Sequence, residues 1–176
     1  MRKSLMIAGA ASIAIGTAAC TSFLTDPHAA TDPNNPAQVT TAQLFTAVQA
    51  AQFLQQEGNE AFLTCLFMQQ CQGVGGRFVS QESEYTITNA TTIAEFPSIY
   101  DAGGLLDIKT IEERSDAAGD MQYKGIAEVW EALVIGTAAD VYGDIPYRDA
   151  VGTSAHPTYD PQLQVYDDVE AKLDQA

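Results

Sequence analysis

The chain has 176 residues, and its 23 acidic residues outnumber its 8 lysines and arginines, which gives a formal net charge of −15. This excess of carboxylates argues against binding to nucleic acid, because phosphate neutralisation needs Lys and Arg, and against electrostatic adhesion to anionic membranes. Hydrophobic residues make up 46% of the chain, so the acidity is not that of a disordered tail. The length predicts one domain or part of one.

The first 19 residues have the three-part order of a secretory signal peptide. Two basic residues precede an apolar run from Leu5 to Ile15, and small residues follow it. A transmembrane anchor is the alternative, because no further charge occurs before Asp26, but the run is short for roughly 30 Å of hydrocarbon. We predict that residues 1–19 are a cleaved signal, and the mature net charge is then 6 − 23 = −17.

Cys20 comes directly after Thr17-Ala18-Ala19, an order that resembles the lipobox of bacterial lipoproteins. We therefore predict that Cys20 becomes the lipidated first residue of the mature chain. Thr17 departs from the aliphatic residue that the lipobox prefers, so an ordinary signal-peptidase cut nearby is the alternative. Residues 20–36 contain three prolines and several Asp, Asn and Thr residues, which predicts an extended tether.

Helical spacing of apolar residues begins at Thr40 or Thr41, either of which can cap the first turn, and continues to Leu54. The Gly-Asn pair at 58–59 is a candidate break, after which the spacing resumes at 62–67. The sequence thus predicts one interrupted helix in this region.

Cys65 and Cys71 lie six residues apart in a chain that we expect to be exported to an oxidising compartment. In one continuous helix they would lie about 9 Å apart along the axis and face different sides, which is too far for a disulfide. A glycine-rich segment at 73–76 allows the helix to end early. A disulfide is therefore expected only if the helix ends between the two cysteines, and free thiols are the alternative.

The segment 78–95 is rich in Thr, Ser and Ile and is compatible with a short strand at Tyr85–Thr88 or with a loop. Pro97 opens the next helical pattern, and its apolar side continues to Ile111. The glycine pair at 103–104 weakens the first half of this helix.

The clearest helical pattern runs from Met121 to Val141. Apolar and small residues recur along it close to the 3.6-residue period, at Tyr123, Ile126, Ala127, Trp130, Leu133, Val134, Thr137, Ala138 and Val141. Further apolar residues cover much of the remaining surface, so we predict that this helix is buried between neighbours. A last helix starts at Asp160, which we expect to cap it, with Pro161 in the first helical position.

A short turn-rich stretch follows the long helix. Gly143 is placed to end the helix in the left-handed conformation, and Pro146 prevents its continuation and favours an extended Ile145. Tyr142 and Tyr147 can cover the helix end with their rings while their hydroxyls stay in water. By itself this stretch predicts a structural role.

The same stretch carries a family resemblance. ADVYGDIPYRDA at 139–150, followed by PTYDPQLQVYDDVEAKLDQA at 157–176, closely resembles the SusD/RagB family of outer-membrane nutrient-uptake lipoproteins. The family motif Asp-x-Tyr-Gly-Asp-x-Pro-Tyr corresponds here to Asp140, Tyr142, Gly143, Asp144, Pro146 and Tyr147. The leader at 20–45 also looks like the family's start, and FPSIYDAGGLLDIKTI is similar to its next aromatic helix, with Phe96 where Trp is common.

This resemblance implies an all-α scaffold of tetratricopeptide-like helix pairs. Such lipoproteins cover TonB-dependent (SusC-like) outer-membrane barrels and deliver glycans or peptides to them, and the resemblance implies no cofactor. Family members are usually longer, so we expect 37–176 to be the N-terminal portion of the helical domain, incomplete at its C-terminus. No ligand-binding residue can be carried over, because the motifs present do not mark one.

Four other interpretations are weighed against this one. An enzyme is not expected, because no catalytic motif occurs and no carboxylate pair is singled out among the acidic residues. A calcium site at Asp140, Asp144 and Asp149 would have suitable oxygen ligands but lacks the EF-hand spacing, so we expect no metal. A helical adaptor for protein partners, without a nutrient ligand, is the main alternative, and a non-binding fragment with an exposed apolar helix face is another.

Overall fold

The computed structural model describes residues 39–76, 84–86, 95–152, 154 and 156–176. The chain divides into two units, Met1–Val39 and Thr40–Ala176, and every element with described bounds lies in the second. The expected signal peptide, Cys20 and the whole of the tether therefore lie outside the described residues.

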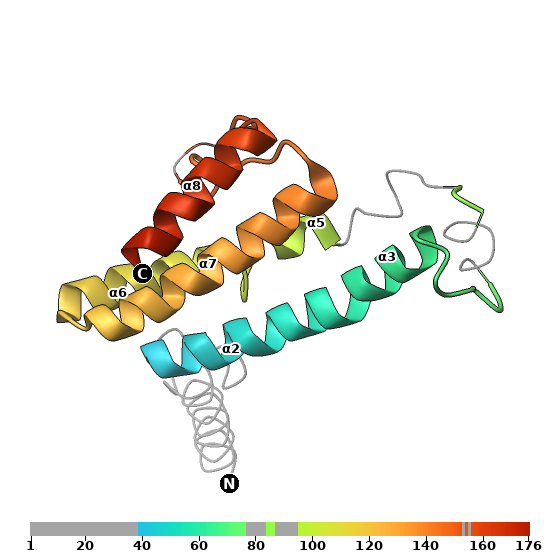
Figure 1. The fold of residues 1–176 in the computed structure, drawn as a ribbon. Helices are drawn as coiled ribbons and strands as arrows, with labels where there is room; N and C mark the ends of the chain where they lie inside the picture. Colours follow the sequence, from blue (N-terminus) through green and yellow to red (C-terminus); the bar gives the residue numbers. More distant parts are fainter. Residues whose placement is uncertain (1–38, 77–83, 87–94, 153, 155) are drawn as a thin grey trace, which may run out of the picture. The chain divides into compact units, whose positions relative to one another are not determined.

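The described part of the second unit is built from helices, which confirms the all-α prediction (Figure 1). In chain order these are α2 (Thr41–Leu54), the π-helical turn η1 (Gln55–Glu60), α3 (Ala61–Phe67), α5 (Glu95–Ser98), α6 (Leu105–Ala118), α7 (Met121–Tyr142) and α8 (Gln162–Gln175). The described residues contain no strand, and one isolated antiparallel bridge joins Ile145 and Asp160. The arrangement as tetratricopeptide-like pairs stays a prediction.

The first helix begins where the sequence predicts. Thr40 and Gln43 form a capping box, in which the Gln43 N–H donates to Thr40 Oγ1 at 3.3 Å and the Thr40 N–H donates to Gln43 Oε1 at 2.9 Å. The helix does not break at 58–59, but widens there into η1 and continues as α3. A π-turn brings residues five apart to the same side, and the buried Gln55 amide donates to Glu60 Oε1 at 3.1 Å.

The single helix expected from Pro97 to Ile111 is in fact two. The chain leaves α5 after Ser98 and starts α6 only at Leu105. A Cβ at Gly104 would overlap the carbonyl oxygen of Ile99, and one at Gly103, whose φ is +83°, would overlap the Cβ of Ala51. The glycine pair therefore permits both the tight turn into α6 and the close approach of α2.

The α6–α7 hairpin forms the centre of the unit, with α8 packed on α7 and α2 packed on α6 (Figure 1). Gly119, with φ 71°, ends α6 in the left-handed conformation, and Asp120 caps α7 by accepting from the Tyr123 N–H at 3.0 Å. Side chains on these helices form one core, which consists of Val48, Ile99, Leu105, Ile108, Ile111, Ala127, Val134, Ile135, Ala138, Ala139, Ile145, Tyr147 and Val165.

The predicted bounds of the long helix α7 are confirmed, but the prediction that its apolar residues are buried on all sides is wrong. Ile126, Val129 and Leu133 are exposed, whereas Glu128 and Glu131 are buried. Trp130 and Tyr123 lie on the side of α7 that meets α2, where both rings pack edge-on against Phe45. Helix α7 is thus covered on two sides and open on a third, rather than buried all round.

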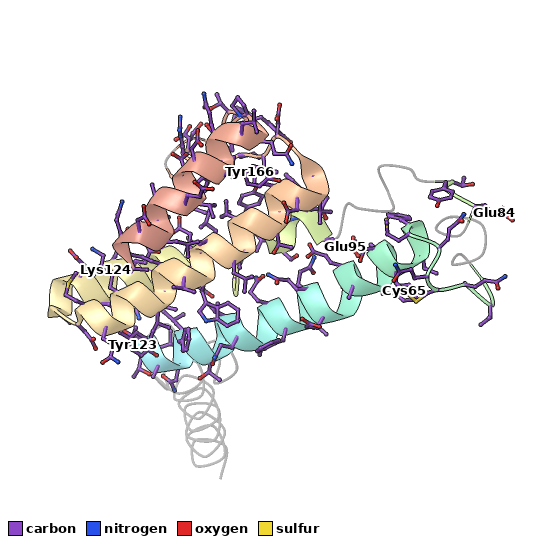
Figure 2. All side chains as sticks on the ribbon, in the orientation of Figure 1. Cys65, Glu84, Glu95, Tyr123, Lys124 and Tyr166 are labelled. Atoms are coloured by element: carbon purple, nitrogen blue, oxygen red, sulfur yellow. A yellow bond between two sulfur atoms is a disulfide. The ribbon has the colours of Figure 1, made fainter. Side chains whose placement is uncertain are left out.

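Helix α3 contains Cys65 and ends at Phe67, before Cys71, so the condition for a disulfide is met. Met68 to Cys71 form a turn in which Gln69 has a φ of 56°. The Cα atoms of Cys65 and Cys71 lie 5.3 Å apart and their sulfurs are bonded (Figure 2). Nearby, Glu84 lies in a turn and Tyr85 and Thr86 have no regular structure, while the last two residues of the expected strand or loop at Tyr85–Thr88 lie outside the described residues.

Candidate functional site

The turn after α7 is held by a short antiparallel contact with the segment that leads into α8. Gly143 ends the helix with φ 77° and ψ −121°, so its φ is positive as expected but its conformation is not left-handed helical. Ile145 is fully buried and extended, and it exchanges two backbone hydrogen bonds with Asp160, of 3.2 and 2.9 Å. The turn therefore fixes the direction in which the following residues leave the helix.

The Asp160 side chain does not cap α8, contrary to the sequence prediction. Its Oδ2 accepts the backbone N–H groups of Tyr147 at 3.0 Å and Arg148 at 2.9 Å. The cap comes from Asp144, whose Oδ1 accepts the Gln162 N–H at 2.9 Å. Pro161 lies one residue before the helix rather than in its first position. The role predicted for Asp160 therefore belongs to Asp144, and Asp160 orders the backbone of the turn instead.

Helices α7 and α8 are also joined near this turn by side chains. The Tyr166 hydroxyl donates to Asp140 Oδ1 at 2.7 Å, and the Gln162 amide donates to the Ala139 carbonyl at 2.8 Å (Figure 2). With Asp140 and Asp144 engaged in these bonds, they form no calcium site with Asp149. Among the described residues no group of three or more potential metal ligands comes together.

The Tyr147 hydroxyl is not in water, which corrects the expectation for this ring. It is buried and donates to Glu131 Oε1 at 2.7 Å. The Tyr142 ring packs edge-on against Phe96 with centroids 5.1 Å apart. Burial, together with the charges of Glu60 and Glu95, raises the pKa of Tyr142 to about 12. Both motif tyrosines are therefore anchored inside the unit.

Glu131 is the centre of a buried ion cluster between α6, α7 and α8. Its side chain is 0% exposed. Lys109 from α6 approaches Oε1 at 2.6 Å, and Lys172 from α8 approaches Oε2 at 3.0 Å. Glu112 is 3.3 Å from the same Lys172 ammonium. One carboxylate on α7 thereby binds cations from both neighbouring helices.

The two glutamates of this cluster titrate in opposite directions. Burial, the hydrogen bond with Glu131 and the charge of Glu131 raise the pKa of Glu112 to about 8. Burial would also raise the pKa of Glu131, but hydrogen bonds from Glu112, Lys109 and Tyr147 and the charge of Lys109 lower it to about 2. At neutral pH the cluster thus holds a charged Glu131 beside a largely protonated Glu112.

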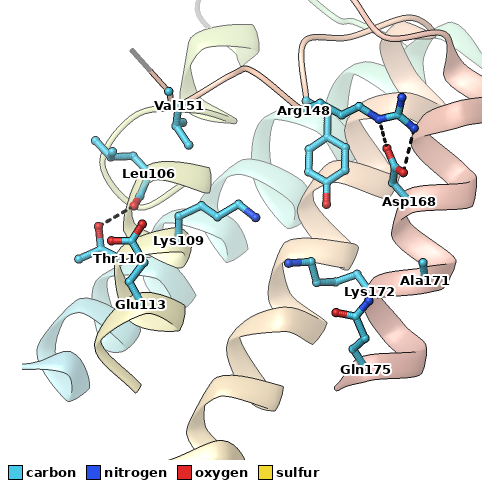
Figure 3. A pocket seen from close by; sticks show the side chains of 12 residues that line it. Leu106, Lys109, Thr110, Glu113, Arg148, Val151, Asp168, Ala171, Lys172 and Gln175 are labelled. Carbon is cyan, nitrogen blue, oxygen red and sulfur yellow. Dashed lines mark hydrogen bonds and ion pairs between the residues drawn. The ribbon is translucent and has the colours of Figure 1, made fainter. Parts of the chain in front are cut away.

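Above this cluster lies a hollow of about 700 Å³, which we call the charged hollow. Arg148 and Asp168 form one side of it through a two-point ion pair, with N–O distances of 2.7 and 3.0 Å (Figure 3). Lys109 and Lys172 extend toward each other across its floor (Figure 3). Each of these three cations is paired with a carboxylate, so the hollow offers little unbalanced charge to a ligand.

A second hollow, of about 710 Å³, lies on the other side of the turn and is called here the aromatic hollow. It is lined by Phe96, Pro97, Tyr100, Asp101, Pro146, Ala150, His156, Pro157 and Tyr159. Rings and prolines dominate this lining, and no Lys or Arg belongs to it. The residues come from three separate segments, 96–101, 146–150 and 156–159. The family resemblance in the sequence includes Phe96, Pro146 and the stretch from Pro157, but it marks none of them as a ligand residue.

Comparison with known proteins decides the family. The model of the SusD-like family, described as "starch-binding associating with outer membrane", matches residues 33–176. The chain belongs to the SusD-like family. No curated protein and no solved structure matches it.

Membership in the SusD-like family confirms the resemblance seen in the sequence and places the chain in a family of binding proteins associated with the outer membrane. Of the six motif residues of this SusD-like chain, Asp140 and Tyr142 lie in the last turn of α7, and the other four lie in the turn that follows it. This turn borders both hollows. No helix in the described part of the chain is long and apolar enough to cross a membrane.

Proposed function

We propose that this chain is an outer-membrane lipoprotein that binds a glycan and passes it to a TonB-dependent, SusC-like transporter barrel. The observation that carries the proposal is the SusD-like family match over residues 33–176, whose description names starch binding and the outer membrane. A peptide is the alternative cargo. The proposal includes lipidation at Cys20 after removal of residues 1–19, with the helical unit facing the outside of the cell.

The geometry supports a binding role more than a catalytic one. The conspicuous polar cluster, around Glu131, uses its charges to pair with Lys109 and Lys172 inside the unit. Rings and prolines instead line an open concavity at the other side of the turn, which is the type of surface that binding sites for small ligands use. A carboxylate pair set on either side of a substrate bond, as glycoside hydrolysis needs, does not emerge from these contacts.

The test is to isolate the tagged chain from native membranes in mild detergent and to identify the proteins that accompany it. A TonB-dependent barrel in near-stoichiometric amount would support the proposal. Cys20→Ala should release the chain from the membrane and reduce the recovery of the barrel. A folded, lipidated chain that brings no barrel and binds no glycan would contradict the proposal.

A helical adaptor without a nutrient ligand is the second candidate, and exposed apolar side chains favour it. Phe53 and Leu54 on α2 and Leu133 on α7 are largely open to solvent, and such residues often mark protein contacts. Leu133→Asp tests this surface, with Leu173→Asp as the control, because the two leucines are 47% and 49% exposed. An adaptor would lose its partner only with the first change and would bind no glycan with either.

A further inference from the structure

The aromatic hollow contains a polar group that the fold leaves without a hydrogen bond. Tyr100 lines the hollow, and its hydroxyl oxygen is enclosed but has no partner in the described structure. Burial, with the nearby Tyr159, Asp160 and Tyr142 groups, raises the pKa of Tyr100, so the hydroxyl keeps its proton at neutral pH. An enclosed hydroxyl without a partner is rare and costly, and it often marks a place for water or a ligand.

The walls of this hollow are fixed by packing elsewhere. The Phe96 ring meets Tyr100 at 5.5 Å and Tyr142 at 5.1 Å, both edge-on. Pro146 is held beside the buried bridge residue Ile145. Tyr159, by contrast, is 64% exposed, so its ring remains open to contact from outside. The hollow thus combines packed inner rings with one accessible ring.

The charge around the hollow selects against anionic ligands. Asp101 belongs to the lining and Asp160 lies close to the Tyr100 hydroxyl. The described Lys109, Arg148 and Lys172 all line the charged hollow instead. A sugar carrying carboxylate or sulfate groups would therefore meet like charge here, while a neutral sugar would not.

We propose that the aromatic hollow is a subsite for an uncharged hexose of a neutral oligosaccharide, with the Tyr159 ring against the apolar face of the sugar. The Tyr100 hydroxyl, which is enclosed in the free protein, is uncovered in this proposal by a small shift of the neighbouring rings and then bonds one of the sugar's hydroxyls. This inference rests on the proposed glycan-binding function and gives that function a location and a ligand class. The volume, about 710 Å³, lies in the range of roughly 300–1,000 Å³ that is common for small-molecule sites. Aromatic rings and a few placed polar groups are the usual lining of such sites.

The experiment is titration calorimetry of the full chain, purified in detergent, with maltoheptaose as the probe. Tyr159→Ala should weaken binding about five- to tenfold through the loss of the ring contact. Tyr100→Phe should weaken it about three- to tenfold by removing one hydrogen bond. Tyr85→Ala is the matched control, because Tyr85 is also about half exposed and lies outside the hollow, and it should leave the affinity unchanged.

Tyr100→Phe also separates binding from folding. The substitution removes a hydroxyl that has no partner in the free protein, so the melting temperature should stay the same or rise slightly. A second measurement uses the wild-type chain and does not depend on a loss of affinity. In NMR spectra of ring-labelled tyrosines, the signals of Tyr100 and Tyr159 should shift during the titration, while the signal of Tyr85 should stay fixed.

Each other outcome overturns a defined part of the inference. If the wild-type chain binds maltoheptaose but neither Tyr100→Phe nor Tyr159→Ala changes the affinity, the subsite is wrong and the glycan-binding function stands. If an oligogalacturonate binds more tightly than maltoheptaose with the same dependence on these tyrosines, the uncharged ligand class is wrong. If the folded wild-type chain binds neither neutral nor acidic oligosaccharides, the subsite and the proposed glycan binding fail together.

Discussion

The two hollows beside the α7–α8 turn are nearly equal in volume but opposite in the state of their polar groups. In the charged hollow, Lys109, Lys172 and Arg148 are each paired with a carboxylate. In the aromatic hollow, the Tyr100 hydroxyl has no partner within the described structure. Neighbouring residues of one turn serve both, since Pro146 lines the aromatic hollow and Tyr147 the charged one. A size comparison alone would have favoured neither hollow. The linings separate them, because paired charges line the charged hollow whereas rings and prolines dominate the aromatic one.

The largest expected effect concerns the buried ion cluster. Glu131→Gln removes the charge that binds Lys109 and Lys172, so two cations lose their main partner inside the unit. Breaking a buried pair in this way costs about 3–5 kcal/mol, and urea unfolding should show a loss of this order. Glu170→Gln, on the exposed side of α8, is the control and should change the unfolding free energy by no more than about 0.5 kcal/mol. A stability change at Glu131 as small as at Glu170 would show that the cluster does not hold the helices together.

The pH dependence of stability should follow the same cluster. The pKa of Glu112 is raised to about 8 in the folded state, so its stabilising contribution is complete below its ordinary pKa near 4.5 and is lost as pH rises toward 8. Over that interval the slope can approach about 1.4 kcal/mol per pH unit. The pKa of Glu131 is lowered to about 2, so the stability that this carboxylate contributes is lost only in acid, as pH falls toward 2. Glu112→Gln should flatten the slope between pH 5 and 8, and an unchanged slope would contradict the assignment.

The third effect tests the backbone contacts of the turn. Asp160→Ala leaves the buried N–H of Tyr147 and the neighbouring N–H of Arg148 without their acceptor. Hydrogen bonds to a charged acceptor contribute about 1.5–3 kcal/mol, so a loss of about 2–3 kcal/mol is expected from thermal or urea unfolding. Asp167→Ala, at an exposed position of α8, should have little effect. If the two variants lose equal stability, the Asp160 side chain is not the acceptor that orders the turn.

The smallest expected effect concerns the cap of α8, and it tests whether Asp144 or Asp160 supplies that cap. Asp144→Ala removes the side chain that accepts the first N–H of α8, and the loss of such a cap costs about 1 kcal/mol. Amide hydrogen exchange should speed up in the first turn of α8 and stay unchanged in α7. Faster exchange of Gln162 in Asp160→Ala, with no change in Asp144→Ala, would restore the cap to Asp160 as the sequence suggested.

The sequence predicted those features that depend on neighbours along the chain. The cap at Thr40, the span of the long helix and the extended Ile145 before Pro146 all follow from local patterns. The burial of Glu131 could not be read in this way, because a glutamate in a helix usually indicates a solvated face. Its partners Lys109 and Lys172 are 63 residues apart in the sequence, so only the packed helices bring them together.

The same limit applies to the candidate ligand site. Tyr100, Pro146 and Tyr159 belong to separate segments, and none of the local patterns around them indicates a shared cavity. The cap of α8 by Asp144 is also a long-range effect, since this acceptor lies 18 residues before Gln162 in the sequence. The sequence around the turn is rich in Tyr and Pro, but without the fold this composition does not show which residues line one cavity.

The π-turn η1 has a consequence for the way this unit tolerates insertions and deletions. It accommodates one more residue than an α-helical turn, and a single residue corresponds to about 100° of rotation around a helix axis. Because the wider turn absorbs the extra residue, deletion of Gly58 should let α2 and α3 join as a regular α-helix, with α3 and its disulfide loop facing nearly the same way as before. A second deletion between Gln55 and Glu60 has no wide turn to absorb it and should rotate the following segment by about 100° around the helix axis.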